Sequence, residues 1–159
     1  KEESQLRYSS GERINELRAF SSMAEKAVFN WLAQAYGESS IKVNTDRKVP
    51  CDFILRKSAN DRVAIDVKVF RQGMIMMSRL KEWKLQAFYA IEKSIFTEYM
   101  LIFVLPGNFE ELSQPEINRV KNAFSYIDVP NLSLVFGVIH GDLFEPLGGN
   151  EIEGFLSQK

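Results

Sequence analysis

One charged pair on a predicted strand is the feature of this sequence best suited to chemistry. The segment Arg62–Phe70 is rich in β-branched side chains and predicts a strand. Because strand side chains alternate between two faces, Asp66 and Lys68 share one face. The other face is aliphatic and predicts core contact; it consists of Val63, Ile65, Val67 and Val69. Burying charges is costly unless they are paired or bind a metal, so the pair indicates a functional cluster.

A second carboxylate, Asp52, opens the strand predicted over Asp52–Arg56. The Asn60-Asp61 turn predicts a hairpin that folds this strand back on the next, which brings Asp52 toward the charged pair. Two carboxylates on neighbouring strands can hold a divalent cation through oxygen, the ligand that Mg²⁺ and Mn²⁺ prefer. A lysine beside them can orient an attacking water or offset charge on a phosphate. The pattern therefore predicts a magnesium or manganese site.

Glu25 is the fourth candidate residue. It lies in a helix predicted over Ser21–Tyr36, which Gly37 is expected to end. Helical projection puts Glu25 at the flank of the apolar stripe, partly turned toward the protein. A glutamate in that position needs a partner, and the metal site or Lys68 would supply one.

The rest of the chain supplies the elements that must position these side chains. Further strands are predicted at Ile41–Asn44, Met100–Leu105 and Leu132–Ile139, and further helices at Ser78–Thr97 and Glu110–Ser125. This order predicts an α/β fold with a mixed central β-sheet flanked by helices. We assign residues 1–159 to one domain, with a lead-in over 1–19, a core over 20–141 and a C-terminal tail over 142–159.

With these elements in place, the motif resembles a known family. The run Pro50-Cys51-Asp52, a hairpin and then Asp66-Val67-Lys68 is similar to the PD-(D/E)XK signature of restriction-endonuclease-like nucleases. The upstream helix with Glu25 is similar as well, and the resemblance covers about residues 23–105. It implies the family's core order, α-β-β-β-α-β-α-β. The sequence departs from the signature where Cys51 separates the proline from the aspartate, and where the second acid is Asp rather than the commoner Glu.

The resemblance also implies a role for each residue. Asp52 and Asp66 would bind Mg²⁺ or Mn²⁺, and the main-chain carbonyl of Val67 would face the metal. Glu25 would be an auxiliary ligand, and Lys68 would position the hydrolytic water. The implied activity is a metal-dependent endonuclease acting on DNA, with RNA as the alternative substrate. Double-strand cleavage usually requires two such sites, which implies a homodimer or a subunit of a larger complex.

Basic residues follow the charged strand: Arg71, Arg79, Lys81 and Lys84. They are interpreted either as phosphate contacts along a bound nucleic acid or as the solvated face of the helix over Ser78–Thr97. Lys84 is the exception, because it projects inside the apolar arc of that helix. The arc consists of Leu80, Trp83, Ala87, Phe88, Ile91 and Ile95.

Composition narrows the class of protein. The chain has 159 residues, of which 45% are hydrophobic and 26% charged, and its net charge is −1. This balance argues against a protein that coats nucleic acid by bulk charge, and no apolar run is long enough to span a membrane. One cysteine, Cys51, and one histidine, His140, exclude a zinc cluster and an internal disulfide framework, and both are expected to be structural. We therefore expect a cytoplasmic protein.

Structural interpretations stay open beside the functional ones. The charged pair could lie on a solvated sheet face, and Asp52 could merely begin a strand after Pro50. Glu25 could be a rim residue paired with any nearby lysine. At the level of function, the alternative to a nuclease is a non-catalytic binding or assembly module in which the charged cluster is a salt-bridge network.

Overall fold

A six-stranded sheet forms the centre of the computed structural model, which describes residues 21–69, 77–93, 96–105, 115, 118, 122 and 131–147. Its strands are β1 (Ile41–Val43), β2 (Phe53–Arg56), β3 (Arg62–Val69), β4 (Glu98–Val104), β5 (Leu132–His140) and β6 (Leu143–Pro146). The helices are the N-terminal helix (residues 21–36), the short 3₁₀ helix η1 (Glu38–Ser40) and α2 (Met77–Glu92).

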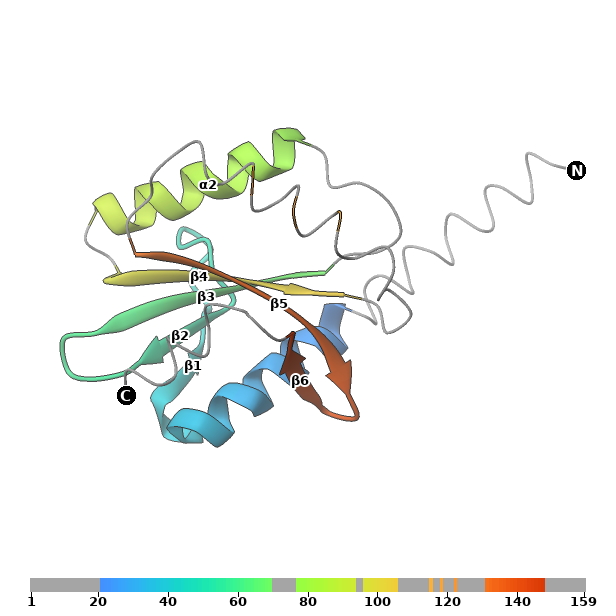
Figure 1. Ribbon diagram of the computed structural model, residues 1–159. Helices are drawn as coiled ribbons and strands as arrows, with labels where there is room; N and C mark the ends of the chain where they lie inside the picture. Colours follow the sequence, from blue (N-terminus) through green and yellow to red (C-terminus); the bar gives the residue numbers. More distant parts are fainter. Residues whose placement is uncertain are drawn as a thin grey trace, which may run out of the picture.

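The strands follow one another across the sheet in chain order, and the sheet is mixed. β1, β2 and β3 are antiparallel, β4 and β5 run parallel to β3, and β6 turns back antiparallel to β5. The N-terminal helix and α2 lie on opposite faces of the sheet (Figure 1). The predicted class, a mixed sheet flanked by helices, is confirmed at this level.

Strand alternation divides the interior into two hydrophobic clusters. Val63, Ile65 and Val67 of β3 face the N-terminal helix and join one cluster. Ala64 faces the other way and packs in the cluster beneath α2 with Ala87 and Ala90. The predicted two-faced character of β3 is therefore confirmed, with Asp66 on the α2 side. Each buried aliphatic side chain contributes about 1.5–3 kcal/mol, so the two clusters hold β3 rigidly between the helices.

The predicted hairpin between β2 and β3 is also present. Its loop is closed by Lys57 N donating to Asp61 O at 3.0 Å and by Asp61 N donating to Ser58 O at 3.3 Å. The register pairs Phe53 with Ile65, so the residue before β2 lies beside the middle of β3. This register determines where Asp52 comes to lie.

Gly37 ends the N-terminal helix, as predicted. Its φ of 88° lies in the left-handed region that glycine adopts without steric cost, and its N–H donates to Ala33 O at 2.8 Å. The chain then reverses through η1 into β1, the strand at one edge of the sheet.

Two predictions about α2 need correction. The helix ends at Glu92 rather than Thr97, because Thr97 instead donates its N–H to Arg62 O at 2.9 Å and leads into β4. Phe88 is 44% exposed rather than buried. The small residues Ala87 and Ala90 centre the face that packs on the sheet, and Phe88 lies about 100° around the helix from Ala87.

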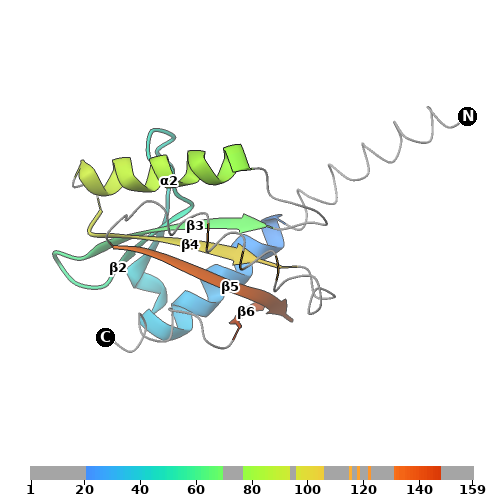
Figure 2. The same cartoon turned by 45° about the horizontal axis from the view of Figure 1, so that its top comes forward.

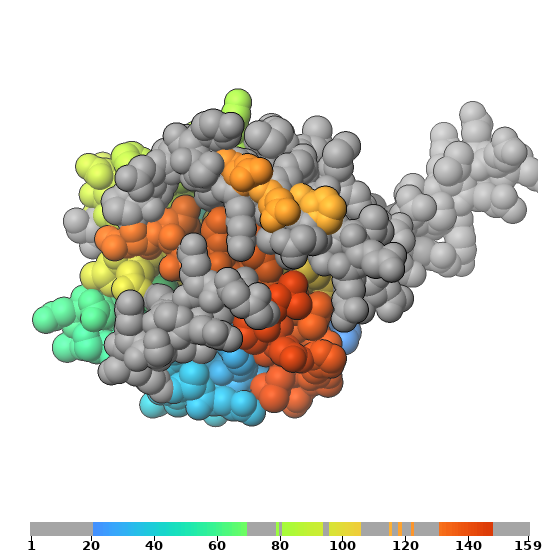
Figure 3. Space-filling view, viewed as in Figure 1, coloured from blue at the N-terminus to red at the C-terminus, as the bar shows by residue number. Residues whose placement is uncertain are grey.

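A sixth strand extends the sheet beyond residue 141, where the sequence analysis ends the core. β6 pairs with β5 through Gly137–Pro146 and Ile139–Phe144. In the rotated and space-filling views, β6 lies against the N-terminal helix (Figures 2 and 3). The predicted tail therefore begins with a structured strand, whose four residues carry too short a pattern for prediction from sequence.

Other predictions fall partly or wholly outside the described residues. Of the helix predicted over 110–125, residues 115, 118 and 122 are described and helical. The lead-in over 1–19, the tail after 147, Arg71, Ile95 and the side chain of Leu80 lie outside the description.

Candidate functional site

Asp66 is the buried carboxylate of the site. It lies on β3 with 6% of its surface exposed, and its Oδ2 is 3.0 Å from Lys68 Nζ. Burial raises the pKa of Asp66 most, the charge of Lys68 lowers it and the charge of Asp52 raises it; together they raise the pKa from 3.8 to about 7. Asp66 therefore holds a proton more readily than an exposed aspartate.

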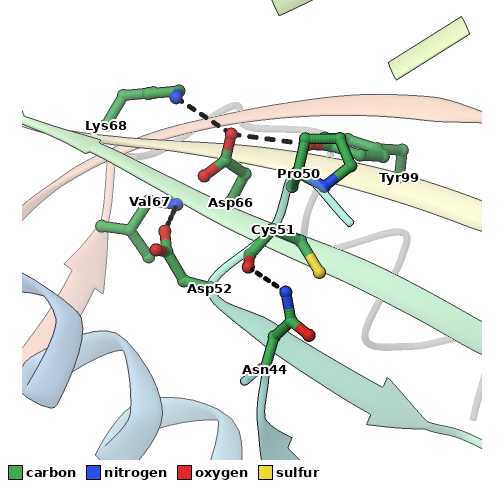
Figure 4. A network of polar contacts seen from close by, with 8 residues as sticks. All are labelled: Asn44, Pro50, Cys51, Asp52, Asp66, Val67, Lys68 and Tyr99. Atoms are coloured by element: carbon green, nitrogen blue, oxygen red, sulfur yellow. Dashed lines mark hydrogen bonds and ion pairs between the residues drawn. The ribbon is translucent and has the colours of Figure 1, made fainter. Parts of the chain in front are cut away.

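Asp52 lies directly beside Asp66. Its Oδ2 accepts a hydrogen bond from Val67 N at 2.7 Å, and its own N–H donates to Ile65 O at 2.9 Å. Asp52 is close enough to Asp66 that its negative charge helps to raise the pKa of Asp66. In the close view, Asp66 extends toward Lys68 and Tyr99, and the Asp52 carboxylate reaches the main-chain N–H of Val67 (Figure 4). The predicted convergence of Asp52, Asp66 and Lys68 is present in the structure.

A short loop before β2 holds Asp52 in place, and Asn44 organises it. The Asn44 side-chain amide donates to the carbonyls of Val49 and Cys51, each at 2.9 Å, and of Asp46 at 3.0 Å. Its main-chain N–H donates to Asp52 O at 2.9 Å. Sequence analysis missed this residue, although asparagine at the end of a strand is a known turn signal.

Tyr99 of β4 is a second residue that sequence analysis missed. Its ring is 1% exposed, and its hydroxyl donates a hydrogen bond to the carbonyl of Pro50. The same oxygen lies 3.4 Å from Asp66 Oδ2 (Figure 4). Burial, and then the charge of Asp66, raises the pKa of Tyr99. Tyr99 thus ties the loop before Asp52 to the strand that bears Asp66, and no local sequence signal connects residues this far apart.

Lys68 is fixed from two sides. Its ammonium pairs with Asp66 and lies 4.9 Å from the centroid of the Trp83 ring on α2. A cation over an aromatic face is stabilised by about 0.5–2 kcal/mol. Trp83 is therefore a positioning residue for the lysine as well as a core residue.

Glu25 occupies the other side of the site. It is half-buried on the N-terminal helix; burial, and then the charge of Asp52, raises its pKa. Glu25 is thus close enough to Asp52 for the Asp52 charge to raise its pKa. Among the described residues, however, no three acidic, histidine or cysteine side chains lie close enough to form a ready-made metal centre.

The predicted nucleic-acid contacts are distributed unevenly. Arg79 and Lys81 are exposed on α2. Lys84 is 3% exposed, as its position inside the apolar arc predicted, and burial lowers the pKa of its ammonium. Lys84 therefore lies between the helix and the sheet rather than on the solvated face.

Cys51 packs against a hydrophobic cluster, and His140 is paired with a glutamate at the surface. Cys51 packs in the cluster beneath α2, and burial, followed by the charges of Asp66 and Asp52, raises the pKa of its thiol to about 12. A thiol with this pKa is protonated at neutral pH and a poor nucleophile. His140 Nε2 lies 2.8 Å from Glu145 Oε2 in an exposed pair across the β5–β6 turn.

Comparisons with models of protein families and with curated proteins give no match to this sequence. Within the described part of the chain, no helix combines the length and apolarity needed to cross a membrane. The case for a function therefore depends on the geometry of the site.

Proposed function

We propose that this chain is a metal-dependent nuclease with a restriction-endonuclease-like core, and that it hydrolyses phosphodiester bonds in DNA. One observation carries the proposal. Asp52 lies near enough to Asp66 for its charge to raise the pKa of Asp66, and the Lys68 ammonium lies 3.0 Å from Asp66 Oδ2. Two neighbouring acids and a lysine, held on and beside adjacent strands, are the groups that such a site needs.

The residues fit a divalent cation of the Mg²⁺ or Mn²⁺ class. The buried Asp66 and the half-buried Asp52 repel each other when both are ionised, and this repulsion helps to raise the pKa of Asp66. A divalent cation would relieve it through the same oxygens. Asp52, Asp66 and the main-chain carbonyl of Val67 would hold the cation, with Glu25 in a supporting role. When bound, the cation supplies charge stabilisation and lowers the pKa of water.

The remaining residues act through position and charge. Lys68, held between Asp66 and Trp83, would orient the attacking water or offset charge on the phosphate. Asn44 and Tyr99 hold the loop that presents Asp52. These contacts position the site before substrate arrives, which is the general requirement for electrostatic catalysis.

The second candidate is a non-catalytic nucleic-acid-binding or assembly module. It is favoured by the ion pair that already neutralises Lys68 and by the lack of a third close side-chain ligand among the described residues. In that case the carboxylates would act only as part of a polar network.

Cleavage assays separate the two candidates. Plasmid, single-stranded DNA and RNA would be incubated with Mg²⁺ or Mn²⁺ and wild type, Asp66→Asn or Lys68→Gln. Since each variant removes one charge from the site, we expect cleavage to fall by about a hundredfold or more. The matched controls, Asp142→Asn and Lys26→Gln, change exposed residues and should cut as wild type does.

Calorimetric titration with Mn²⁺ gives an independent readout. Wild type should bind the ion, and Asp66→Asn should bind it at least tenfold more weakly, about 1.4 kcal/mol. A wild type that neither cuts any of the three substrates nor binds Mn²⁺ would exclude the enzyme and leave the non-catalytic module.

A further inference from the structure

A cavity with cationic residues in its lining lies away from the carboxylates, near the β1 edge of the sheet. It has a volume of about 270 Å³ and is lined by three cationic side chains, Lys42, Arg56 and Arg62, together with the consecutive serines at 39 and 40. No acidic residue lines it, and its apolar wall consists of Ile41 and Ile54. A neighbouring cavity of about 210 Å³ shares Lys42, Ile54 and Arg62 with it.

Sheet register explains why these cations converge. Arg56 of β2 lies opposite Arg62 of β3, and Lys42 of β1 lies opposite Ile54. Residues two apart on one strand share a face, and so do residues opposite each other on paired strands. The three cations therefore project from the same face of three successive strands, the face that also bears Asp66.

The cations are unusually poor in partners. Arg62 Nε is buried and donates no hydrogen bond to any described residue, while the guanidinium lies 5.5 Å from the centroid of the Phe96 ring. Within that same part of the chain, neither Lys42 nor Arg56 forms an ion pair. A buried donor without an acceptor destabilises the folded protein by about 1–3 kcal/mol. Binding of an anion that accepts this hydrogen bond would remove that cost.

Charge around the cavity differs from that of the whole chain. Residues 42–62 contain six Lys or Arg and three Asp or Glu, whereas the whole chain has 20 and 21. Like charges in a concave surface raise the local positive potential and attract anions. Arginine side chains match the oxygens of phosphate in pairs, and serine hydroxyls add neutral donors. The lining thus fits a phosphate group better than a single carboxylate.

We propose that the cavity lined by Lys42, Arg56 and Arg62 binds a backbone phosphate of a nucleic acid. The choice of nucleic acid rests on the proposed function, whereas the affinity for phosphate does not. Arg62 and Asp66 are four residues apart on β3, or about 13 Å at roughly 3.3 Å per residue. The cavity therefore takes a phosphate about four nucleotides from the one at the carboxylates, at about 3.4 Å of axial rise each.

Anisotropy of fluorescein-labelled oligonucleotides tests this site without any metal. Full-length wild type and the Lys42→Gln/Arg56→Gln variant would be titrated in EDTA over a series of NaCl concentrations. Both substitutions are on exposed side chains, so the fold should be kept, as circular dichroism would verify. We expect affinity for duplex DNA to fall roughly tenfold and the salt slope to become shallower by about two, since two phosphate contacts are lost.

The matched control is Lys26→Gln/Lys93→Gln, which removes two exposed charges elsewhere and should leave the salt slope unchanged. Arg62→Gln should weaken binding as well, with partial rescue in Arg62→Lys. Titration with inorganic phosphate separates the two sources of the ligand. The variant could lose phosphate binding and keep its oligonucleotide affinity. That result would assign the cavity to a free phosphate and overturn the nucleic-acid assignment.

Unchanged oligonucleotide affinity, salt slope and phosphate binding in the variant would overturn the site altogether. Because the assay contains EDTA, these outcomes do not depend on metal binding at the carboxylates. A wild type that neither binds Mn²⁺ nor cleaves would count against the metal site alone. A salt slope that is the same in the variant and in wild type would count against the cavity alone.

Discussion

Asp66 is the residue at which opposing electrostatic effects act on one buried side chain. It is nearly inaccessible, yet the charge of Asp52 acts on it and the Lys68 ammonium lies 3.0 Å away. Desolvation and the Asp52 charge favour the protonated form, and Lys68 favours the ionised one. Asp66 therefore exchanges its proton near neutral pH in the folded protein.

The pH dependence of stability tests this balance. The pKa of Asp66 is raised to about 7 in the folded protein, from an ordinary value of 3.8. Between these values the folded state binds more protons than the unfolded state, so the free energy of unfolding should fall as pH rises from about 4 to 7. The slope contributed by one group is at most about 1.4 kcal/mol per pH unit. Urea unfolding of wild type and Asp66→Asn in EDTA measures it.

Asp66→Asn should flatten this part of the stability profile, whereas Asp142→Asn, at an exposed site, should leave it unchanged. With Mn²⁺ present, the trend should reverse in wild type, because deprotonation strengthens metal binding. A wild-type profile that matches that of Asp66→Asn in EDTA would contradict the raised pKa.

At the scale of single elements, close packing between β5 and β6 depends on one glycine. A Cβ added at Gly137 would lie 2.4 Å from the main-chain oxygen of Glu145 and 2.4 Å from the ring of Phe144. Main-chain atoms cannot rotate away as a side chain can, so β6 itself would have to shift. β6 can therefore lie this close to β5 only because residue 137 has no side chain.

Gly137→Ala should destabilise the protein by about 1–3 kcal/mol or more through this overlap. The control is Gly141→Ala, where φ is 63° but nothing lies within 4 Å of the added carbon. That change should cost about 1–2 kcal/mol from the left-handed backbone alone. Thermal unfolding in EDTA compares the two, and an equal or smaller loss in Gly137→Ala would contradict the predicted overlap.

At the scale of the whole molecule, contacts distant in sequence hold the N-terminal helix against the sheet. The Trp31 and Phe144 rings meet edge to face at 5.0 Å, and Asn30 Nδ2 donates to Asp142 O at 2.9 Å. These contacts join residues more than 100 positions apart, and the helix they hold carries Glu25. β6 is therefore part of what positions the far side of the site.

Phe144→Ala should cost about 3–5 kcal/mol, because Phe144 is 2% exposed and its removal leaves a cavity beneath the helix. Phe144→Leu should cost less, since it keeps most of the apolar volume. The loss should be visible in urea unfolding, and amide exchange of residues 21–36 should increase in the alanine variant. Unchanged exchange in that helix would show that β6 does not hold it.

Most of the strands and helices, and the two faces of β3, follow from local patterns in the sequence. Strand alternation predicted that Asp66 and Lys68 share a face, and turn residues predicted the hairpin that brings Asp52 beside them. Helical projection predicted that Glu25 faces partly toward the protein. Each of these depends on the geometry of one strand, helix or turn, which neighbouring residues specify. The prediction was wrong where a local pattern competes with packing, as at Phe88 and at the end of α2.

The contacts that distant residues make with the site depend on the tertiary structure. Tyr99 reaches the loop before Asp52 because β4 lies beside β3, and Trp83 reaches Lys68 because α2 crosses that face. The cationic cavity depends in the same way on the register of three strands. Strand order and register depend on how the whole chain buries its apolar surface, so no segment of the sequence encodes them alone.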